Sequence, residues 1–148
     1  MKLRLATVND LPELVVLGRQ LHQESTYSSM DYDDEIVKES LTDLMNKNQF
    51  VVVAEDINGS VVGVMAGSVM QSWFGKDLIA NDLVLLIRKD LRGGLIAYRL
   101  IKNFVLWAKL AGAKQIRPGV TTGNENADTL YERLGFKRCG STYFMEGV

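Results

Sequence analysis

The sequence contains few of the residues that cross-link, break or anchor a chain. Its single cysteine, Cys139, excludes a disulfide within the chain and favours a reducing, cytoplasmic setting. Proline occurs only at positions 12 and 118, and there is no repeat, low-complexity tract or linker. No apolar run approaches the roughly 20 residues of a membrane span, and the first residues lack the apolar core of a secretion signal. We therefore expect one cytoplasmic domain over residues 1–148 that does not contact a membrane.

The chain also has one histidine, His22, and neither it nor Cys139 lies in a recognisable nucleophile–base motif. Catalysis through a covalent enzyme intermediate is therefore disfavoured. The composition, with 47% hydrophobic and 24% charged residues, is that of an ordinary globular domain. A domain of 148 residues buries roughly two thirds of its unfolded surface, so it needs no cross-links.

The net charge of −1 conceals two segments of opposite sign. Residues 1–87 hold 6 Lys and Arg against 13 Asp and Glu, whereas residues 88–117 hold 8 Lys and Arg against one acid, Asp90. The basic segment favours an anion such as phosphate, and the acidic part favours a cationic partner. Because sequence segments need not form surface patches, solvated and interspersed charges are the alternative interpretation.

Hydrophobic periodicity and capping residues predict four helices. Asn9 is the expected cap of the first, whose opening turn holds Asp10 and Pro12. The second covers about 34–46 and has acids at its N-terminal end. The strongest helical pattern covers 95–111, and a shorter one covers about 124–134.

Six strands are expected between and after these helices, at residues 2–6, 50–55, 61–72, 82–88, 115–117 and 138–145. Asn58-Gly59 predicts a hairpin in which both central residues have positive φ. The order β α α β β β α β α β predicts an α/β (α+β) domain with a mixed sheet and helices on both faces.

The segment 88–95, Arg-Lys-Asp-Leu-Arg-Gly-Gly-Leu, connects a predicted buried strand to the strongest predicted helix. The first turn of a helix offers free N–H groups and a positive dipole end, and paired glycines allow close approach of a ligand. Three basic side chains add charge suited to phosphate. The segment is neither a phosphate-binding P-loop nor a dinucleotide fingerprint. Taken alone, it can equally be a basic turn whose glycines serve only the backbone geometry.

The segment 124–136 reads Asn-Glu-Asn-Ala-Asp-Thr-Leu-Tyr-Glu-Arg-Leu-Gly-Phe. It matches the Asn-x-x-Ala-x-x-Leu-Tyr-Glu-x-x-Gly-Phe segment of the GNAT superfamily of N-acetyltransferases, and residues 92–97 resemble that family's Arg-Gly-x-Gly-x-Gly/Ala cofactor loop. The predicted element order is also the family's, so the resemblance covers essentially the whole chain and implies a mostly antiparallel sheet. One position departs from the pattern, because Leu95 replaces the second loop glycine and Gly94 lies one place earlier.

The resemblance implies acetyl-CoA as the acyl donor, no metal, and direct attack by the acceptor amine in a ternary complex. Ile87 would pair its backbone with the pantetheine arm where two strands splay, and an amide near it would polarise the thioester carbonyl. Pro118 fits such a splay because it has no N–H to give to a ladder. The implied cofactor-binding residues are Ile87, Arg88, Lys89, Arg92, Gly93, Gly94, Leu95, Ile96, Ala97 and Asn124.

The resemblance also implies that Tyr131 is the general acid that protonates the departing thiolate. A packed, half-buried aromatic is the alternative role for this residue. The resemblance also makes Asp82, at the start of the strand leading to Ile87, the candidate general base, because it is the carboxylate nearest to the position where the family often has one. Asp77 or a chain of water molecules is equally defensible.

The resemblance also implies that the acceptor is an amine on a small molecule, a protein or a peptide, and that residues 24–34 with Trp73 and Phe74 border its cleft. The acids of residues 24–35 favour a cationic acceptor, although an acidic helix start explains them equally well. A non-catalytic acyl-CoA-binding or protein-interaction module is the main alternative function, motivated by Leu95. Nucleic-acid binding through residues 88–117 is disfavoured because no recognition motif is present. The sequence leaves a homodimer open.

Overall fold

The computed structural model describes residues 1–123 and 125–148, in which five strands form one sheet in the order β1-β2-β3-β4-β5. The first four strands pair antiparallel, and β5 joins β4 in parallel. The predicted mixed, mostly antiparallel sheet is therefore confirmed. The strands are β1 (Lys2–Leu5), β2 (Phe50–Glu55), β3 (Val61–Gln71), β4 (Leu78–Ile87) and β5 (Ala113–Arg117).

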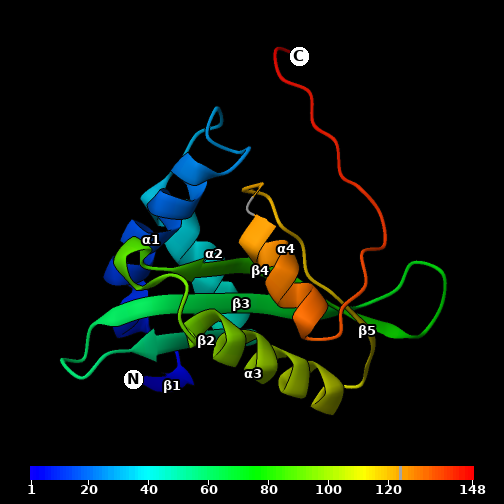
Figure 1. Cartoon of the computed structure of the whole chain (residues 1–148), viewed down its shortest axis with the longest axis horizontal. Helices are drawn as coiled ribbons and strands as arrows, with labels where there is room; N and C mark the ends of the chain where they lie inside the picture. The colour runs from blue at the N-terminus through cyan, green and yellow to red at the C-terminus, as the bar shows by residue number, and fades with distance from the viewer. Residues whose placement is uncertain (124) are drawn as a thin grey trace.

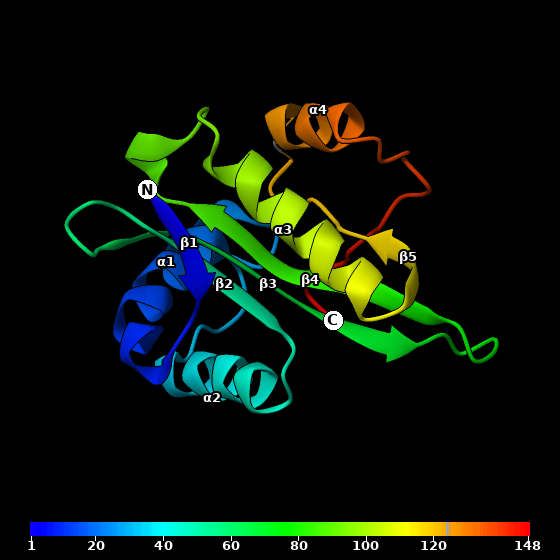
Figure 2. The same ribbon diagram turned by 90° about the horizontal axis from the view of Figure 1, so that it is seen from below.

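Four helices pack against this sheet in the described part of the chain, two on each face. Figure 2 shows α1 and α2 on one side of the strands and α3 and α4 on the other, as predicted. None of the described helices is long and apolar enough to cross a membrane. The helices are α1 (Leu11–Glu24), α2 (Asp34–Asn46), α3 (Ile96–Leu110) and α4 (Glu125–Arg133).

Alternating side chains of the central strands fill two apolar layers. On β2, Val52 packs toward α3 while Val51 and Val53 pack toward α1 and α2. Phe104 of α3 is fully buried above the sheet, and a Cβ at Gly67 of β3 would lie 2.7 Å from its ring. A glycine is thus required at position 67, because the helix approaches the sheet too closely for any larger residue.

The N-terminal helix begins differently from the prediction. A 3-10 turn at Val8–Asp10 precedes α1, and the carboxylate of Asp10 accepts the Thr7 backbone N–H at 2.8 Å. The same carboxylate forms a two-pronged ion pair with Arg4, with both N–O distances 2.8 Å, and this partner lowers the pKa of Asp10. Asn9 is therefore not the cap, because it lies inside this 3-10 turn and Asp10 is the residue that precedes α1.

The second helix has the predicted bounds, and its start is explained by the residue before it. The side chain of Asp33 accepts the backbone N–H groups of Glu35 and Ile36 at 2.8 and 3.2 Å. In the β2–β3 hairpin the prediction was half right, since Gly59 has φ +83° but Asn58 does not have positive φ. Asp56 makes a wider turn there by accepting N–H groups from Asn58 and Ser60, which removes the need for a second left-handed residue.

The predicted final strand over Arg138–Met145 is wrong, because these residues form no ladder. They continue as an extended tail that rises past α4, and Tyr143 and Met145 are 90% and 80% exposed (Figure 1). Alternating apolar residues form a strand only where a neighbouring strand accepts their hydrogen bonds, and Gly140 further weakens the strand tendency of the segment. The tail is attached through side-chain contacts of Arg138 with Asp128, Arg117 with Cys139 and Ser29 with Glu146.

Candidate active site

Strands β4 and β5 separate partway along β4, at one side of the sheet. Their parallel pairing ends at Asn81 and Arg117, and Pro118 follows immediately. Because proline has no N–H to donate, the ladder cannot continue on β5. Within the described residues, β4 from Asp82 to Ile87 therefore has a free edge on the side that β5 has left.

A β-bulge marks the start of this free edge. Ala66 pairs with Val84 and Gly67 pairs with Asp82, so Leu83 is an extra residue on β4. Leu83 is 59% exposed although it belongs to an interior strand. Bulges of this kind redirect neighbouring side chains and occur frequently beside active sites.

The first residue of the free edge carries a perturbed carboxyl group. Oδ1 of Asp82 accepts the backbone N–H of Gly119 at 3.0 Å. Burial raises the pKa of Asp82 to about 6, while that hydrogen bond acts in the opposite direction. A carboxyl group with such a pKa is ionised at neutral pH and remains basic enough to accept a proton.

Tyr131 of α4 lies close enough to Asp82 for the charge of that carboxyl group to change the pKa of its hydroxyl. Burial raises the pKa of the Tyr131 hydroxyl, and the charge of Asp82 raises it further. The tyrosine is 8% exposed, and its ring packs edge-to-face against Phe136 with 5.4 Å between centroids. The hydroxyl is therefore held in its neutral, proton-carrying form next to a carboxyl group that readily changes charge.

Asp77, the alternative candidate for the general base, lies away from the point where β4 and β5 separate. Asp77 belongs to the β3–β4 hairpin, where its carbonyl accepts the N–H of Ser72 at 2.8 Å. Figure 1 places this hairpin at the far end of the sheet, beyond β5. Trp73 and Phe74 stand on the same hairpin, 86% and 81% exposed, so the structure does not bring them to the α1–α2 connection that was expected to share an acceptor cleft with them.

The turn between β4 and α3 is open to a ligand. Gly93 has φ +85°, a conformation that favours glycine, and no atom lies within 4 Å of a Cβ built at this position. A Cβ at Gly94 would approach only the Leu91 carbonyl, at an ordinary 3.8 Å. Leu95 has αR backbone angles and is 72% exposed, so its side chain does not cover the turn. Leu95, which replaces the second glycine of the family's loop, therefore fits this turn in an ordinary backbone conformation.

The arginines of this turn have partners within the protein. Arg88 forms an ion pair with Asp90 at 2.7 Å. Arg92 donates from Nε to the Ile87 carbonyl at 3.1 Å and from its terminal nitrogen to Glu24 at 2.7 Å. The Arg92 side chain therefore connects the end of the free β4 edge to the end of α1, and a ligand on that edge competes with it.

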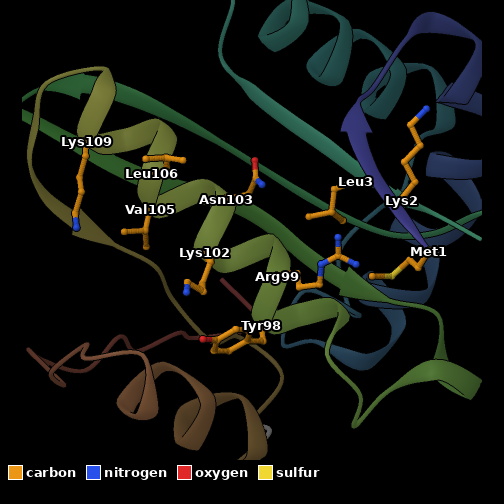
Figure 3. A pocket seen from close by; sticks show the side chains of 10 residues that line it. All are labelled: Met1, Lys2, Leu3, Tyr98, Arg99, Lys102, Asn103, Val105, Leu106 and Lys109. Carbon is orange, nitrogen blue, oxygen red and sulfur yellow. The ribbon is translucent and has the colours of Figure 1, made fainter.

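A basic groove continues from the turn along α3. Figure 3 shows that its side chains come from β1 and from successive turns of α3. Lys2, Arg99, Lys102 and Lys109 line it, and none of its lining residues is acidic. Of the basic residues of 88–117, Arg99, Lys102 and Lys109 thus share one surface that begins one helical turn after the glycines, whereas Arg88 and Arg92 are paired with acids elsewhere.

The remaining predicted residues fall in different environments. Ile96 and Ala97 pack partly against the apolar layer under α3, which leaves their backbone in the first turn of the helix. Lys89 is exposed in the 3-10 turn Lys89–Leu91. Asn124 lies outside the described residues, so its predicted contact with the cofactor has no structural counterpart here.

Two residues of the site were not identified as partners by the sequence. Gly119, which donates to Asp82, follows the proline at the point where β4 and β5 separate. A Pro-Gly pair directly after a strand indicates that the chain leaves the sheet there, and this pair was the signal present in the sequence. Glu24 was assigned to the acceptor instead of to Arg92, because no local pattern connects residues 68 positions apart.

Three acids at the end of the α1–α2 connection and the start of α2 have partners within the protein. Asp34 forms an ion pair with Arg19, Glu35 forms one with Lys38 at 3.3 Å, and Asp33 caps α2. The connection itself is tied to the loop after β5, because Thr26 donates its N–H to the Thr121 carbonyl at 3.2 Å. The two loops therefore approach each other beside the splay.

Comparison with solved structures identifies many chains with this fold. A mutant of the BH1408 protein from Bacillus halodurans superposes with a TM-score of 0.82 at 18% identity, and each chain covers 100% of the other. A ribosomal-protein-alanine N-acetyltransferase from Brucella melitensis has a TM-score of 0.82 at 23% identity, covering 95% of this chain and 86% of that chain. An acetyltransferase from Trypanosoma brucei has a TM-score of 0.77 at 16% identity over 98% of both chains.

These identities establish a common fold and no more. No curated protein sequence matches the chain. The sequence itself matches the acetyltransferase (GNAT) domain family over residues 46–138, which include β2 to α4 and therefore the free edge, the glycine turn and Tyr131. The chain belongs to the GNAT acetyltransferase family.

Proposed function

We propose that the protein transfers the acetyl group of acetyl-CoA to a primary amine at the free edge of β4. One observation carries this proposal. Where β4 and β5 separate, the charge of Asp82, a carboxyl group with a pKa of about 6, raises the pKa of the buried neutral hydroxyl of Tyr131. Family membership favours acetyl transfer in general, and this pair supplies the acid and the base that the reaction needs.

The residues of the turn fit the donor. The phosphates of CoA are anions that backbone N–H groups at the start of α3 can bind, and no side chain obstructs the backbone at Gly93 or Gly94. Arg99 and Lys102 on the exposed side of α3 add positive charge for a further phosphate. The unpaired edge from Asp82 to Ile87 offers backbone groups to the amide-containing arm, after Arg92 has released the Ile87 carbonyl.

When bound, acetyl-CoA supplies a thioester whose carbon–sulfur bond breaks as the acceptor nitrogen forms the new carbon–nitrogen bond. Asp82 takes the proton that the acceptor nitrogen loses. Tyr131 gives its hydroxyl proton to the departing sulfur. Transfer of the proton from Asp82 to the tyrosine, directly or through water, restores both groups, so no external acid or base is consumed.

Release of free thiol from acetyl-CoA in the presence of a broad panel of primary amines tests this proposal. We expect thiol release that depends on the amine, and formation of the corresponding N-acetyl product by mass spectrometry. Tight binding of CoA without thiol release from any amine would instead favour a non-catalytic acyl-CoA-binding module. Absence of both CoA binding and thiol release would remove acetyl transfer from consideration.

A further inference from the structure

Helix α3 carries apolar residues on two sides, although only one side packs against the sheet. The inward side is fully buried and consists of Leu100, Ile101, Phe104 and Ala108. On the outward side, Leu106 and Leu110 are 59% and 81% exposed. A helix that is apolar on all sides is normally covered on all sides. The outward side of α3 is therefore a surface that suits a binding partner.

The outward apolar residues lie in one row along the helix. Every fourth residue belongs to this row, which consists of Tyr98, Lys102, Leu106 and Leu110. The Lys102 ammonium lies 5.3 Å from the centre of the Tyr98 ring. We call these four residues, together with the neighbouring Lys109, the outer ridge of α3. Rows of this spacing are the ridges that fit between the side chains of a second helix.

The charges around the outer ridge have one sign. Arg99 and Lys2 line the same groove as Lys102 and Lys109, and none of the residues that line it is acidic (Figure 3). Within the described residues, no ion pair involves Lys102 or Lys109. Their positive charge therefore faces solvent and favours a partner that carries acidic side chains.

A second copy of this chain does not match the outer ridge. Two copies that meet ridge to ridge bring like charges together, which opposes association. The acidic start of α2 lies on the opposite face of the sheet from α3 (Figure 2). Contacts between α3 of one copy and α2 of the next would form a ring or a filament instead of a closed dimer. A different protein is therefore the favoured occupant.

We propose that the outer ridge of α3 binds an acidic amphipathic helix of another protein. Apolar residues of that helix cover Leu106 and Leu110, and its carboxylates pair with Lys102 and Lys109. The inference goes beyond acetyl transfer and does not depend on it. Leu110 lies about 16 Å along the helix axis from Arg99, which is assigned to the donor, so the end of the ridge stays accessible when CoA is bound.

Binding of a synthetic peptide to the whole chain tests this inference. The probe is a helical peptide of about 18 residues, with leucine at every third or fourth position and glutamate between. It should bind in titration calorimetry both without CoA and with CoA at saturation. Lys109→Glu and Leu110→Ser should each weaken binding at least about tenfold, because the ridge then loses a charge partner or an apolar contact.

Two matched controls make the same changes elsewhere. Lys47→Glu alters an exposed cation of α2, and Ile57→Ser alters a side chain that is 92% exposed in the β2–β3 hairpin. Neither should change the affinity for the peptide. All four variants should keep the melting temperature of the wild type, since each replaced side chain is exposed.

Several outcomes would overturn the inference. These are no binding of the glutamate peptide, equal binding of a version with lysine in place of glutamate, and equal weakening by Lys47→Glu and Lys109→Glu. Tighter binding of a single-stranded RNA of about ten nucleotides, lost in Lys109→Glu, would assign the ridge to nucleic acid instead. None of these measurements needs thiol release, so they decide the inference whether or not acetyl transfer is observed.

Discussion

The backbone N–H of Gly119 donates a hydrogen bond to Oδ1 of Asp82 over 3.0 Å. This bond joins the first unpaired residue of β4 to the loop that carries β5 away, so the point at which the sheet opens also orients the carboxyl group. The bond favours the charged carboxylate, whereas burial disfavours it, and burial is the larger influence on the pKa.

The first prediction concerns the pH dependence of catalysis. Because the pKa of Asp82 is about 6, kcat/KM should rise as pH increases through about 6, as the carboxyl group loses its proton and becomes able to act as a base. Asp82→Asn should remove this rising limb and lower kcat/KM at pH 7.5 by about 100-fold. Initial rates between pH 5 and 8 measure the effect, and an unchanged rising limb in Asp82→Asn would assign it to another group.

The second prediction is that Asp82→Asn, which should lower activity, makes the protein thermally more stable relative to the wild type as pH rises. A carboxyl group whose pKa is raised by folding stabilises the fold when protonated, and this contribution is lost as pH rises from the ordinary value of 3.8 through about 6. Asp82→Asn should therefore gain thermal stability relative to the wild type on going from pH 4 to pH 7.5. Melting temperatures of both proteins at the two pH values test this, and an equal difference at both would show that the carboxyl group has an ordinary pKa.

The third prediction concerns the candidate acid. Tyr131→Phe removes the hydroxyl but keeps the ring that packs against Phe136, so the folded structure should be retained. Loss of a general acid should lower kcat by about 100-fold, with little change in the dissociation constant of CoA. Steady-state rates and calorimetric titration with CoA measure the two quantities. If kcat is unchanged over the whole pH range, the tyrosine has only a packing role.

The fourth prediction uses the glycine turn. Gly94→Val should weaken CoA binding at least about tenfold, since its side chain stands where the phosphates approach the backbone. The free energy of unfolding should hardly change, because a Cβ at Gly94 meets only the Leu91 carbonyl at 3.8 Å. Gly75→Val is the matched control, because no atom lies within 4 Å of a Cβ there and the residue belongs to the distant β3–β4 hairpin. Equal CoA affinity in both variants would move the phosphate site away from this turn.

The fifth prediction concerns the ion pair between Glu24 and Arg92. Glu24→Gln should strengthen CoA binding a few-fold, because binding then no longer requires the ion pair between Arg92 and Glu24 to break. An exposed ion pair of this kind is worth up to about 1 kcal/mol, which limits the gain to roughly fivefold. Titrations at low and high salt measure the effect, and the difference between the two proteins should shrink as salt screens the pair. Weaker binding in Glu24→Gln would mean that the carboxylate positions Arg92 for the ligand.

The sequence predicted the helices and central strands because their signals are local. The bounds of α2 were predicted without error, since an amphipathic pattern follows a capping aspartate. The strand ending at Ile87 was correctly placed but begins earlier than predicted, at Leu78, because its first residues gain a partner in β5 that the local pattern does not reveal. The final strand failed for the converse reason, as a favourable pattern at Arg138–Met145 found no partner.

The site was only partly accessible to sequence reasoning. The family resemblance pointed to both Asp82 and Tyr131. The effect of the Asp82 charge on the pKa of Tyr131, however, depends on the splay of two strands and on the packing of α4, which are tertiary features. The bulge at Leu83 likewise has no local signature, because it arises from a register shift between β3 and β4. The partnership of Arg92 with Glu24 reassigned an acid that composition alone had given to the acceptor.

The two outer strands of the sheet have a consequence for behaviour at high concentration. β1 carries exposed Lys2, and β5 carries exposed Lys114 and Arg117. An outer strand with unsatisfied backbone groups is a template on which a second molecule can add its own strand, and cationic side chains oppose this by repelling another edge of the same kind. Contact between β1 of one molecule and β5 of the next would bring these like charges together. The protein should therefore resist linear polymerisation through its sheet, and this resistance should weaken as salt screens the repulsion.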